Sequence, residues 1–184
     1  TDTVSRLIRV KITSEPPTMA NVNPTEFCAG EVDSITLSCS GGTLGTGAAA
    51  YWYEDSSFTG PALATGNEVT IAAPTDTIKY YIRIEGDCNI TEAVSVEVIV
   101  NPIPMPVVEG VMTVCIPAQQ DYYASGFDGS SFNWSVSGGT ILGSDSGSTV
   151  TVEWIGEGSG SVQVTETTVS GCMATTDSVV VKHP

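Results

Sequence analysis

The chain has 184 residues, of which only 15% are charged, and its formal net charge is −15. This length is typical of one large domain or of two small ones. The only histidine, His183, is next to the last residue, which argues against Ser-His-Asp, Cys-His and His-ligated zinc chemistry. Six basic residues against 21 acidic ones argue against binding to nucleic acid or to anionic lipid. We therefore expect no nucleic-acid partner and no membrane insertion.

Short runs of alternating apolar and polar residues recur along the chain, separated by Gly-Gly, Asp-Gly and Thr-Gly steps. Such alternation is typical of antiparallel strands that bury one face. No sustained helical periodicity interrupts them. In chain order, the clearest runs are 34–39, 94–98, 150–153 and 161–164. The sequence therefore predicts an all-β protein made of two tandem antiparallel β-sandwich domains.

One pattern occurs three times, at residues 1–5, 91–95 and 176–180, and each copy runs into a β-rich tail that is followed by proline. A repeat of this spacing is typical of stacked sandwich domains, each closed by its last strand. No domain stands in front of the first copy. We therefore interpret residues 1–13 as an orphan strand, the terminal strand of a preceding module. The alternative is a first strand that pairs with the first domain itself.

The rest of the chain divides at the proline-rich stretch 101–106. Alternating prolines favour an extended joint, because proline cannot donate to a β-ladder. We therefore expect a first sandwich over residues 14–101 and a second over residues 102–184.

Five cysteines are spread over the two expected domains. Pairing within each domain gives Cys28–Cys88 and Cys115–Cys172, and each bond would stabilise the fold by roughly 4 kcal/mol on a loop-entropy model. Cys39 continues the inward phase of its strand, so we interpret it as a buried free thiol that acts as a small hydrophobic residue. Cys39–Cys88 is the competing pair, because spacing alone does not fix connectivity. Two disulfides would place the protein in an oxidising, extracellular compartment.

Trp52 follows Cys39 by 13 residues, and Tyr80 stands two residues before Ile82. An immunoglobulin-like sandwich buries a tryptophan on strand C and has a tyrosine two residues before the second cysteine, on strand F. Trp52 and Tyr80 fit these two roles, with Ile82 where the second cysteine would stand. The first domain is therefore predicted to be Ig-like.

On these residues, and on Cys28-Ala29-Gly30-Glu31 and Ser40-Gly41-Gly42, the first domain resembles the Ig-like modules of large Bacteroidota surface proteins. The second resembles their PKD-like modules over 132–141, 150–154 and 171–172. It departs from the better-known PKD pattern, because Ser-Val-Ser-Gly-Gly follows Trp134 in place of Asp-Phe-Gly-Asp-Gly. The resemblance implies a repeat region of a cell-surface adhesin, of the gliding-motility type exported by the type IX system. It also fits the spacer modules of secreted polysaccharide hydrolases.

Asp followed by Ser or Thr and then by an aliphatic residue resembles the O-glycosylation sequon of exported Bacteroidota proteins. The candidate acceptors are Thr3, Ser34, Thr77 and Ser178. The alternative is that these residues simply begin strands after turns.

Tyr51 and Tyr53 are candidates for sugar contact, because alternation places them on the face opposite to a buried Trp52. The alternative is cross-strand packing. No Asp-x-Asp-x-Asp run occurs, so we interpret the acidic loops as solvated turns rather than calcium sites. We expect no metal, no cofactor and no catalytic residues.

The sequence as a whole predicts a non-catalytic structural or adhesive repeat segment of an exported bacterial cell-surface protein, which extends and displays a binding region. The alternative is a carbohydrate-binding or spacer module of a secreted polysaccharide hydrolase. The expected partners are neighbouring modules of the same polypeptide, with a glycan or surface ligand as a further candidate.

Overall fold

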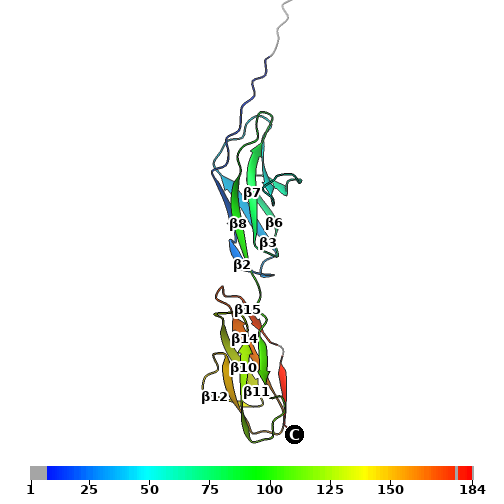
Figure 1. The fold of residues 1–184 in the computed structure, drawn as a ribbon. Coiled ribbons are helices and arrows are strands. Elements are labelled where there is room, and N and C mark those ends of the chain that lie inside the picture. The colour runs from blue at the N-terminus through cyan, green and yellow to red at the C-terminus, as the bar shows by residue number, and fades with distance from the viewer. Residues whose placement is uncertain (1–7, 177, 184) are drawn as a thin grey trace, which may run out of the picture. The chain divides into compact units, whose positions relative to one another are not determined.

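The computed structural model describes residues 8–176 and 178–183. The chain divides into two compact units, Thr1–Asn101 and Pro102–Pro184 (Figure 1). Within the described residues every regular element is a strand. The predicted all-β class with two tandem sandwiches is therefore confirmed.

The first unit is a sandwich of a three-stranded sheet, in the order β1-β3-β6, and a five-stranded sheet, in the order β2-β8-β7-β4-β5. Neighbouring strands are antiparallel except for β2 and β8, which run parallel. The strands of this unit are β1 (Met19–Asn23), β2 (Glu26–Cys28), β3 (Ser34–Ser40), β4 (Ala49–Tyr53), β5 (Ala64–Thr65), β6 (Glu68–Ala72), β7 (Ile78–Glu85) and β8 (Val94–Asn101).

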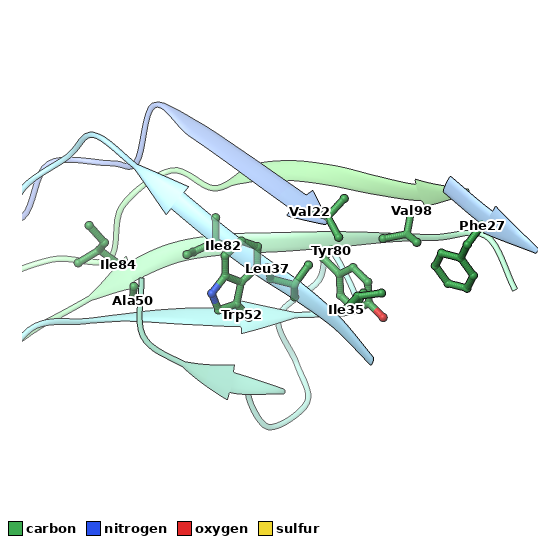
Figure 2. Close-up of a cluster of buried hydrophobic side chains, with 10 residues drawn as sticks. All are labelled: Val22, Phe27, Ile35, Leu37, Ala50, Trp52, Tyr80, Ile82, Ile84 and Val98. Carbon is green, nitrogen blue, oxygen red and sulfur yellow. The ribbon is translucent and has the colours of Figure 1, made fainter. Parts of the chain in front are cut away.

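The core of the first unit is built from the inward-facing residues of both sheets (Figure 2). Trp52 of β4 is fully buried, and its indole Nε1 donates a hydrogen bond to the Gly66 carbonyl oxygen at 3.0 Å. Leu37 and Ile82 are buried in the same cluster. Tyr80 is also buried there. The predicted core roles of Trp52 and Tyr80 are thus observed, and an aliphatic residue, Ile82, stands where an Ig domain has its second cysteine.

The second unit is a sandwich of two further sheets. One has the order β12-β13-β10-β9. In the other, β14 pairs with β11 along one edge and with both β15 and β16 along the other. The strands are β9 (Val107–Gly110), β10 (Ala118–Ser125), β11 (Ser131–Ser137), β12 (Thr140–Leu142), β13 (Thr149–Trp154), β14 (Gly158–Thr167), β15 (Met173–Thr175) and β16 (Val179–His183).

Aromatic side chains with a satisfied polar tip anchor the core of the second unit. The Tyr122 ring meets the Trp154 ring edge-on, with 6.3 Å between the centroids, and the Tyr122 hydroxyl donates to the Val111 carbonyl at 2.9 Å. Trp134 donates from its indole nitrogen to the Gly147 carbonyl at 2.8 Å. Buried aromatic residues are stable in such positions because the polar tip keeps a hydrogen-bond partner.

The repeated sequence pattern has the same structural role in both units. Its tails form β8 and β16, the last strand of each sandwich. Thr91 donates its N–H to the Ile84 carbonyl at 2.9 Å, and its Oγ1 accepts the Ile84 N–H at 3.0 Å. Thr176 makes the same pair of bonds with Val164, at 2.9 and 3.1 Å. We call this two-bond arrangement the threonine clasp, and the repeated pattern the closing-strand signature.

The segment before the first sandwich forms no strand over residues 8–13, and residues 1–7 lie outside the described residues. Its interpretation as the terminal strand of a preceding module stays a prediction. The Ile12 carbonyl accepts the Thr46 N–H at 2.9 Å, and the Lys11 ammonium lies 3.0 Å from an Asp87 carboxylate oxygen. Within the first unit, this segment therefore contacts two loops and not the edge of a strand.

Candidate functional site

The outer face of the sheet around β4 carries the two tyrosines predicted to contact sugar. As expected, Tyr51 and Tyr53 lie on the face opposite to Trp52. The expected exposure is wrong for Tyr53, which is only 8% exposed, while Tyr51 is partly buried. The reason is the loop between β4 and β5, which brings the Phe58 ring edge-on to Tyr53, with 5.1 Å between the centroids.

Beside Tyr53, two charged residues of β7 complete a compact cluster. Arg83 donates from Nε to Glu85 Oε1 at 2.8 Å, and its Nη2 lies 2.8 Å from the same oxygen. The Tyr53 hydroxyl also donates to Glu85 Oε1, at 2.5 Å. The guanidinium lies 4.1 Å from the Phe58 ring centroid, in a cation–π geometry. We call Tyr53, Phe58, Arg83 and Glu85 the outer-face cluster.

The electrostatics of the outer-face cluster keep its charges paired. The hydrogen bond from Tyr53, followed by the bond and charge of Arg83, lowers the pKa of the Glu85 carboxyl. Burial, followed by the bond to Glu85, raises the pKa of the Tyr53 hydroxyl. Glu85 is therefore an ionised, fully engaged acceptor at neutral pH, which makes it a poor general base. Through the contacts of Phe58 with Tyr53 and Arg83, the cluster holds the loop against the sheet.

An open cavity of about 370 Å³ lies between the end of β4 and the loop that follows it. Its lining residues are Tyr53, Glu54, Asp55, Gly60, Pro61, Ala62 and Leu63. The hydroxyl and the backbone N–H of Ser57 lower the pKa of Asp55. This face presents the partly buried Tyr51 and the acidic residues Glu54 and Asp55 to solvent, while Tyr53 only lines the cavity. Sugar contact by Tyr51 and Tyr53 stays a prediction.

Alternation could reveal part of the outer-face cluster before the structure was known, because Arg83 and Glu85 share one face of a predicted strand. The role of Phe58 has no such signal. This residue lies in an irregular loop and adopts a positive φ of 55°, a rare conformation for a bulky side chain.

The candidate glycosylation residues lie apart from one another. Ser34, Thr77 and Ser178 are exposed, and Thr3 lies outside the described residues. The Thr77 hydroxyl accepts the Val100 N–H at 3.0 Å, so it already supports the closing strand β8. Modification at these positions stays a prediction.

The cysteines are not paired as predicted. Cys39, Cys88 and Cys115 carry free thiols, whereas Cys28 and Cys172 are disulfide-bonded. The predicted pairs Cys28–Cys88 and Cys115–Cys172 are therefore absent. Cys39 is partly buried, its Sγ lies 3.9 Å from Asn67 Oδ1, and burial raises the pKa of its thiol.

Strand register explains why neither predicted pair forms. Cys28 lies beside Asn101, at the end of β8, whereas Cys88 lies in the loop before β8 begins. Eight residues of strand at ~3.3 Å each separate these levels by roughly 25 Å. Cys115 follows Val114, whose N–H is bonded to Lys182, and Lys182 pairs with Ser159 near the start of β14. Cys172 lies beyond the other end of β14. A disulfide needs Cα atoms within about 7 Å.

Among the residues that the structure describes, no three or more His, Cys, Asp or Glu side chains are grouped as a metal ion would require. In the same described part of the chain, no helix has the length and apolar character to span a bilayer.

Residues 15–102, which make up the first sandwich, match the family model of the Ig-like domain, CHU_C-associated. The first unit is therefore similar to an Ig-like module in sequence as well as in strand order. The comparison with curated proteins gives no match.

Among solved structures, the chain is similar to a C-terminal intimin fragment in complex with the translocated intimin receptor (TM-score 0.46, 14% identity), covering 91% of this chain and 64% of the fragment. It is similar to the fibronectin(III)-like modules of Clostridium thermocellum CbhA (TM-score 0.37, 16% identity), covering 90% of this chain and 94% of that one. It is also similar to Sidekick-1 immunoglobulin domains 1–4 (TM-score 0.43, 15% identity), covering 93% of this chain and 49% of that one. These are likenesses of fold, and they carry no argument about ligands.

Proposed function

We propose that the chain is a non-catalytic structural or adhesive repeat segment of an exported bacterial cell-surface protein. The observation that carries the proposal is the closing-strand signature. Two of its three copies close an Ig-like or related sandwich, and each does so through a threonine clasp. A signature that closes one module after another is typical of modular repeat proteins.

The third copy, at the N-terminal end of the sequence, has the apolar pattern of a closing strand without a described sheet to join. When Thr1 is aligned with Thr91, Ile8 and Val10 take the places of Val98 and Val100. Val98 is fully buried, whereas Ile8 is 87% exposed and Val10 83% exposed. Arg6 departs from the pattern, because it takes the place of Val96. We propose that residues 1–13 close the sheet of a neighbouring module, and that neighbouring modules of the same polypeptide are the first partners.

The finer assignment follows from the motif resemblance. Ig-like and PKD-like modules of Bacteroidota surface proteins share the motifs of both units, which supports an adhesin of the gliding-motility type, exported by the type IX system. Two disulfide-bonded cysteines support an oxidising, extracellular location.

Protease shaving tests the proposed location. Intact cells of the source organism are treated with trypsin, and the released peptides are identified by mass spectrometry. A surface segment releases peptides such as 84–182, which spans both units and ends at Lys182, under conditions that leave a cytoplasmic marker protein uncut. Release of this segment only after lysis contradicts the proposal.

Glycan binding separates the proposal from a sugar-binding module of a hydrolase. A structural segment gives no saturable binding on a glycan array, and Tyr51→Ala changes nothing. Saturable binding that Tyr51→Ala abolishes favours the carbohydrate-binding alternative. Lys79→Ala is the matched surface control, because Lys79 lies on the neighbouring strand β7 and is exposed.

A further inference from the structure

Each unit carries a cysteine at the end where its chain leaves. In the first unit, Cys28 follows the buried Phe27 on a strand that runs parallel to β8. In the second unit, Cys115 follows the buried Val114, whose N–H donates to the Lys182 carbonyl of β16 at 2.9 Å in the same parallel sense. We call Cys28 and Cys115 the exit-end cysteines, because both lie where the closing strand finishes.

Each unit also carries a cysteine at its opposite end, in the loop before the closing-strand signature. Cys88 stands three residues before Thr91, and Cys172 stands four residues before Thr176. We call these the loop cysteines. The loop of Cys88 lies where the chain enters the first unit, because Asn89 bonds to the Ser14 backbone at 2.8 and 2.9 Å and Asp87 pairs with Lys11.

One cysteine of each kind is bonded, and the other of each kind is free. The exit-end Cys28 and the loop Cys172 are disulfide-bonded, so both kinds of position support a disulfide in this fold. The exit-end Cys115 and the loop Cys88 are free and exposed. The strand lengths given above prevent any exit-end cysteine from reaching the loop cysteine of its own unit. Cys39 and Cys88 are both free, so they do not form a pair within the first unit. A bond from Cys88 or Cys115 to a cysteine of the other kind must therefore reach beyond the unit that carries it.

We propose that Cys88 and Cys115 are linking cysteines that bond to further modules of the same kind on either side of this segment. Cys88 pairs with the exit-end cysteine of the module whose chain enters the first unit. Cys115 pairs with the loop cysteine of the module that its chain enters. The inference rests on the proposed function, because it requires flanking modules. Its effect is to join consecutive modules covalently at their facing ends.

The linking step is a two-electron oxidation. Two thiols lose two protons and two electrons as the S–S bond forms, and a small-molecule disulfide such as oxidised glutathione accepts them and becomes two thiols. The reaction proceeds by thiolate attack through a mixed disulfide. Exposure of both sulfur atoms allows this exchange, whereas the partly buried Cys39 is a slower partner.

A duplicated chain tests the inference with the protein's own modules. It consists of residues 1–184 followed directly by a second copy that starts at residue 10, because Pro184 aligns with Arg9 when Thr176 is aligned with Thr1. This joint keeps the spacing between the signature and the unit that follows it. The inference expects Cys115 of the first copy to reach Cys88 of the second. The chain has ten cysteines, five from each copy. Three free thiols in each copy give six without the link and four with it.

The readout is alkylation in denaturant without reduction, after folding in a glutathione redox buffer. We expect four alkyl groups and, after cleavage at glutamate, a disulfide between peptide 86–92, which carries Cys88, and peptide 110–153, which carries Cys115. The two copies give identical peptides, so the variants below assign each peptide to its copy. Cys88→Ser in the second copy removes that pair and gives five groups. The same substitution in the first copy is the matched control, which keeps the pair and gives three groups.

Six alkyl groups without the linked peptide overturn the inference, and so does a bond that uses Cys88 of the first copy or Cys39. Calorimetry of the same duplicated chain keeps the proposed function separate. Cooperative melting of both copies with six free thiols leaves a modular segment without covalent links. Loss of cooperative melting in the second copy contradicts the modular account itself.

Discussion

Removing the hydroxyl of one threonine clasp gives the clearest test of how each sandwich is closed. Thr91→Val keeps the shape of the side chain and leaves the buried Ile84 N–H without its acceptor at 3.0 Å. An unsatisfied buried donor costs about 1–3 kcal/mol. A loss of about 2 kcal/mol lowers the melting temperature of a unit of this size by roughly 8–16 °C.

Hydrogen exchange measured by mass spectrometry reads the two units separately. Thr91→Val should speed the exchange of the protected β7 amides about thirtyfold, with β14 unchanged. Thr176→Val should act on β14 and leave β7 unchanged. Thr70→Val is the matched control, because its exposed hydroxyl faces only the Thr36 hydroxyl at 3.4 Å, and it should cost less than about 0.5 kcal/mol. A Thr91→Val variant as stable as the Thr70→Val control would refute the clasp.

Three further outcomes are expected. Alkylation of the denatured, unreduced single chain should add three groups, at Cys39, Cys88 and Cys115, whereas the pairing predicted from sequence would give one. The pKa of Glu85 is lowered by folding, so its contribution to stability is full at neutral pH and is lost as the pH falls from about 4.3 through the lowered value. An acid titration of Glu85→Gln should therefore lose less stability over that window than the parent chain does, and equal losses contradict the assignment. Deleting residues 1–10 should leave the melting temperature unchanged, whereas deletion through Ser14 removes the bonds to Asn89 and should lower it by several degrees.

Local pattern was sufficient to predict the strands and the core anchors. Period-two alternation placed Ile35 and Leu37 inward, and the spacing of Trp52 and Tyr80 identified an Ig-like core. The alternation depends only on neighbours within one strand, and the Trp–Tyr spacing is a feature common to Ig-like sandwiches. Both can therefore be read from the sequence alone.

Features that depend on which distant segments meet at one end of the sandwich could not be predicted from local pattern. The predicted disulfides failed because cysteines of one domain can stand at opposite ends of the same sheet, and spacing does not reveal this. Tyr53 was predicted to be exposed because alternation gives the face of a residue and not the loop that covers it. In the sequence, the threonine clasp is visible only as a threonine that recurs in the repeated pattern. The role of its hydroxyl depends on the fold, which brings the Ile84 and Val164 N–H groups to the two threonines.

The central claim is that the third copy of the signature is a closing strand, and a graft tests it most directly. Residues 91–101 of the first unit are replaced by residues 1–11, with Arg6→Val because Val96 packs against the core. Ile8 and Val10 then fall on the places of Val98 and Val100, and the first unit should melt cooperatively, within about 2 kcal/mol of the parent. A second graft of residues 2–12 shifts the register by one, turns the apolar face outward and should unfold the unit. A folded first unit in the first graft only is the predicted result, and an unfolded first graft, or two grafts that behave alike, would contradict the account.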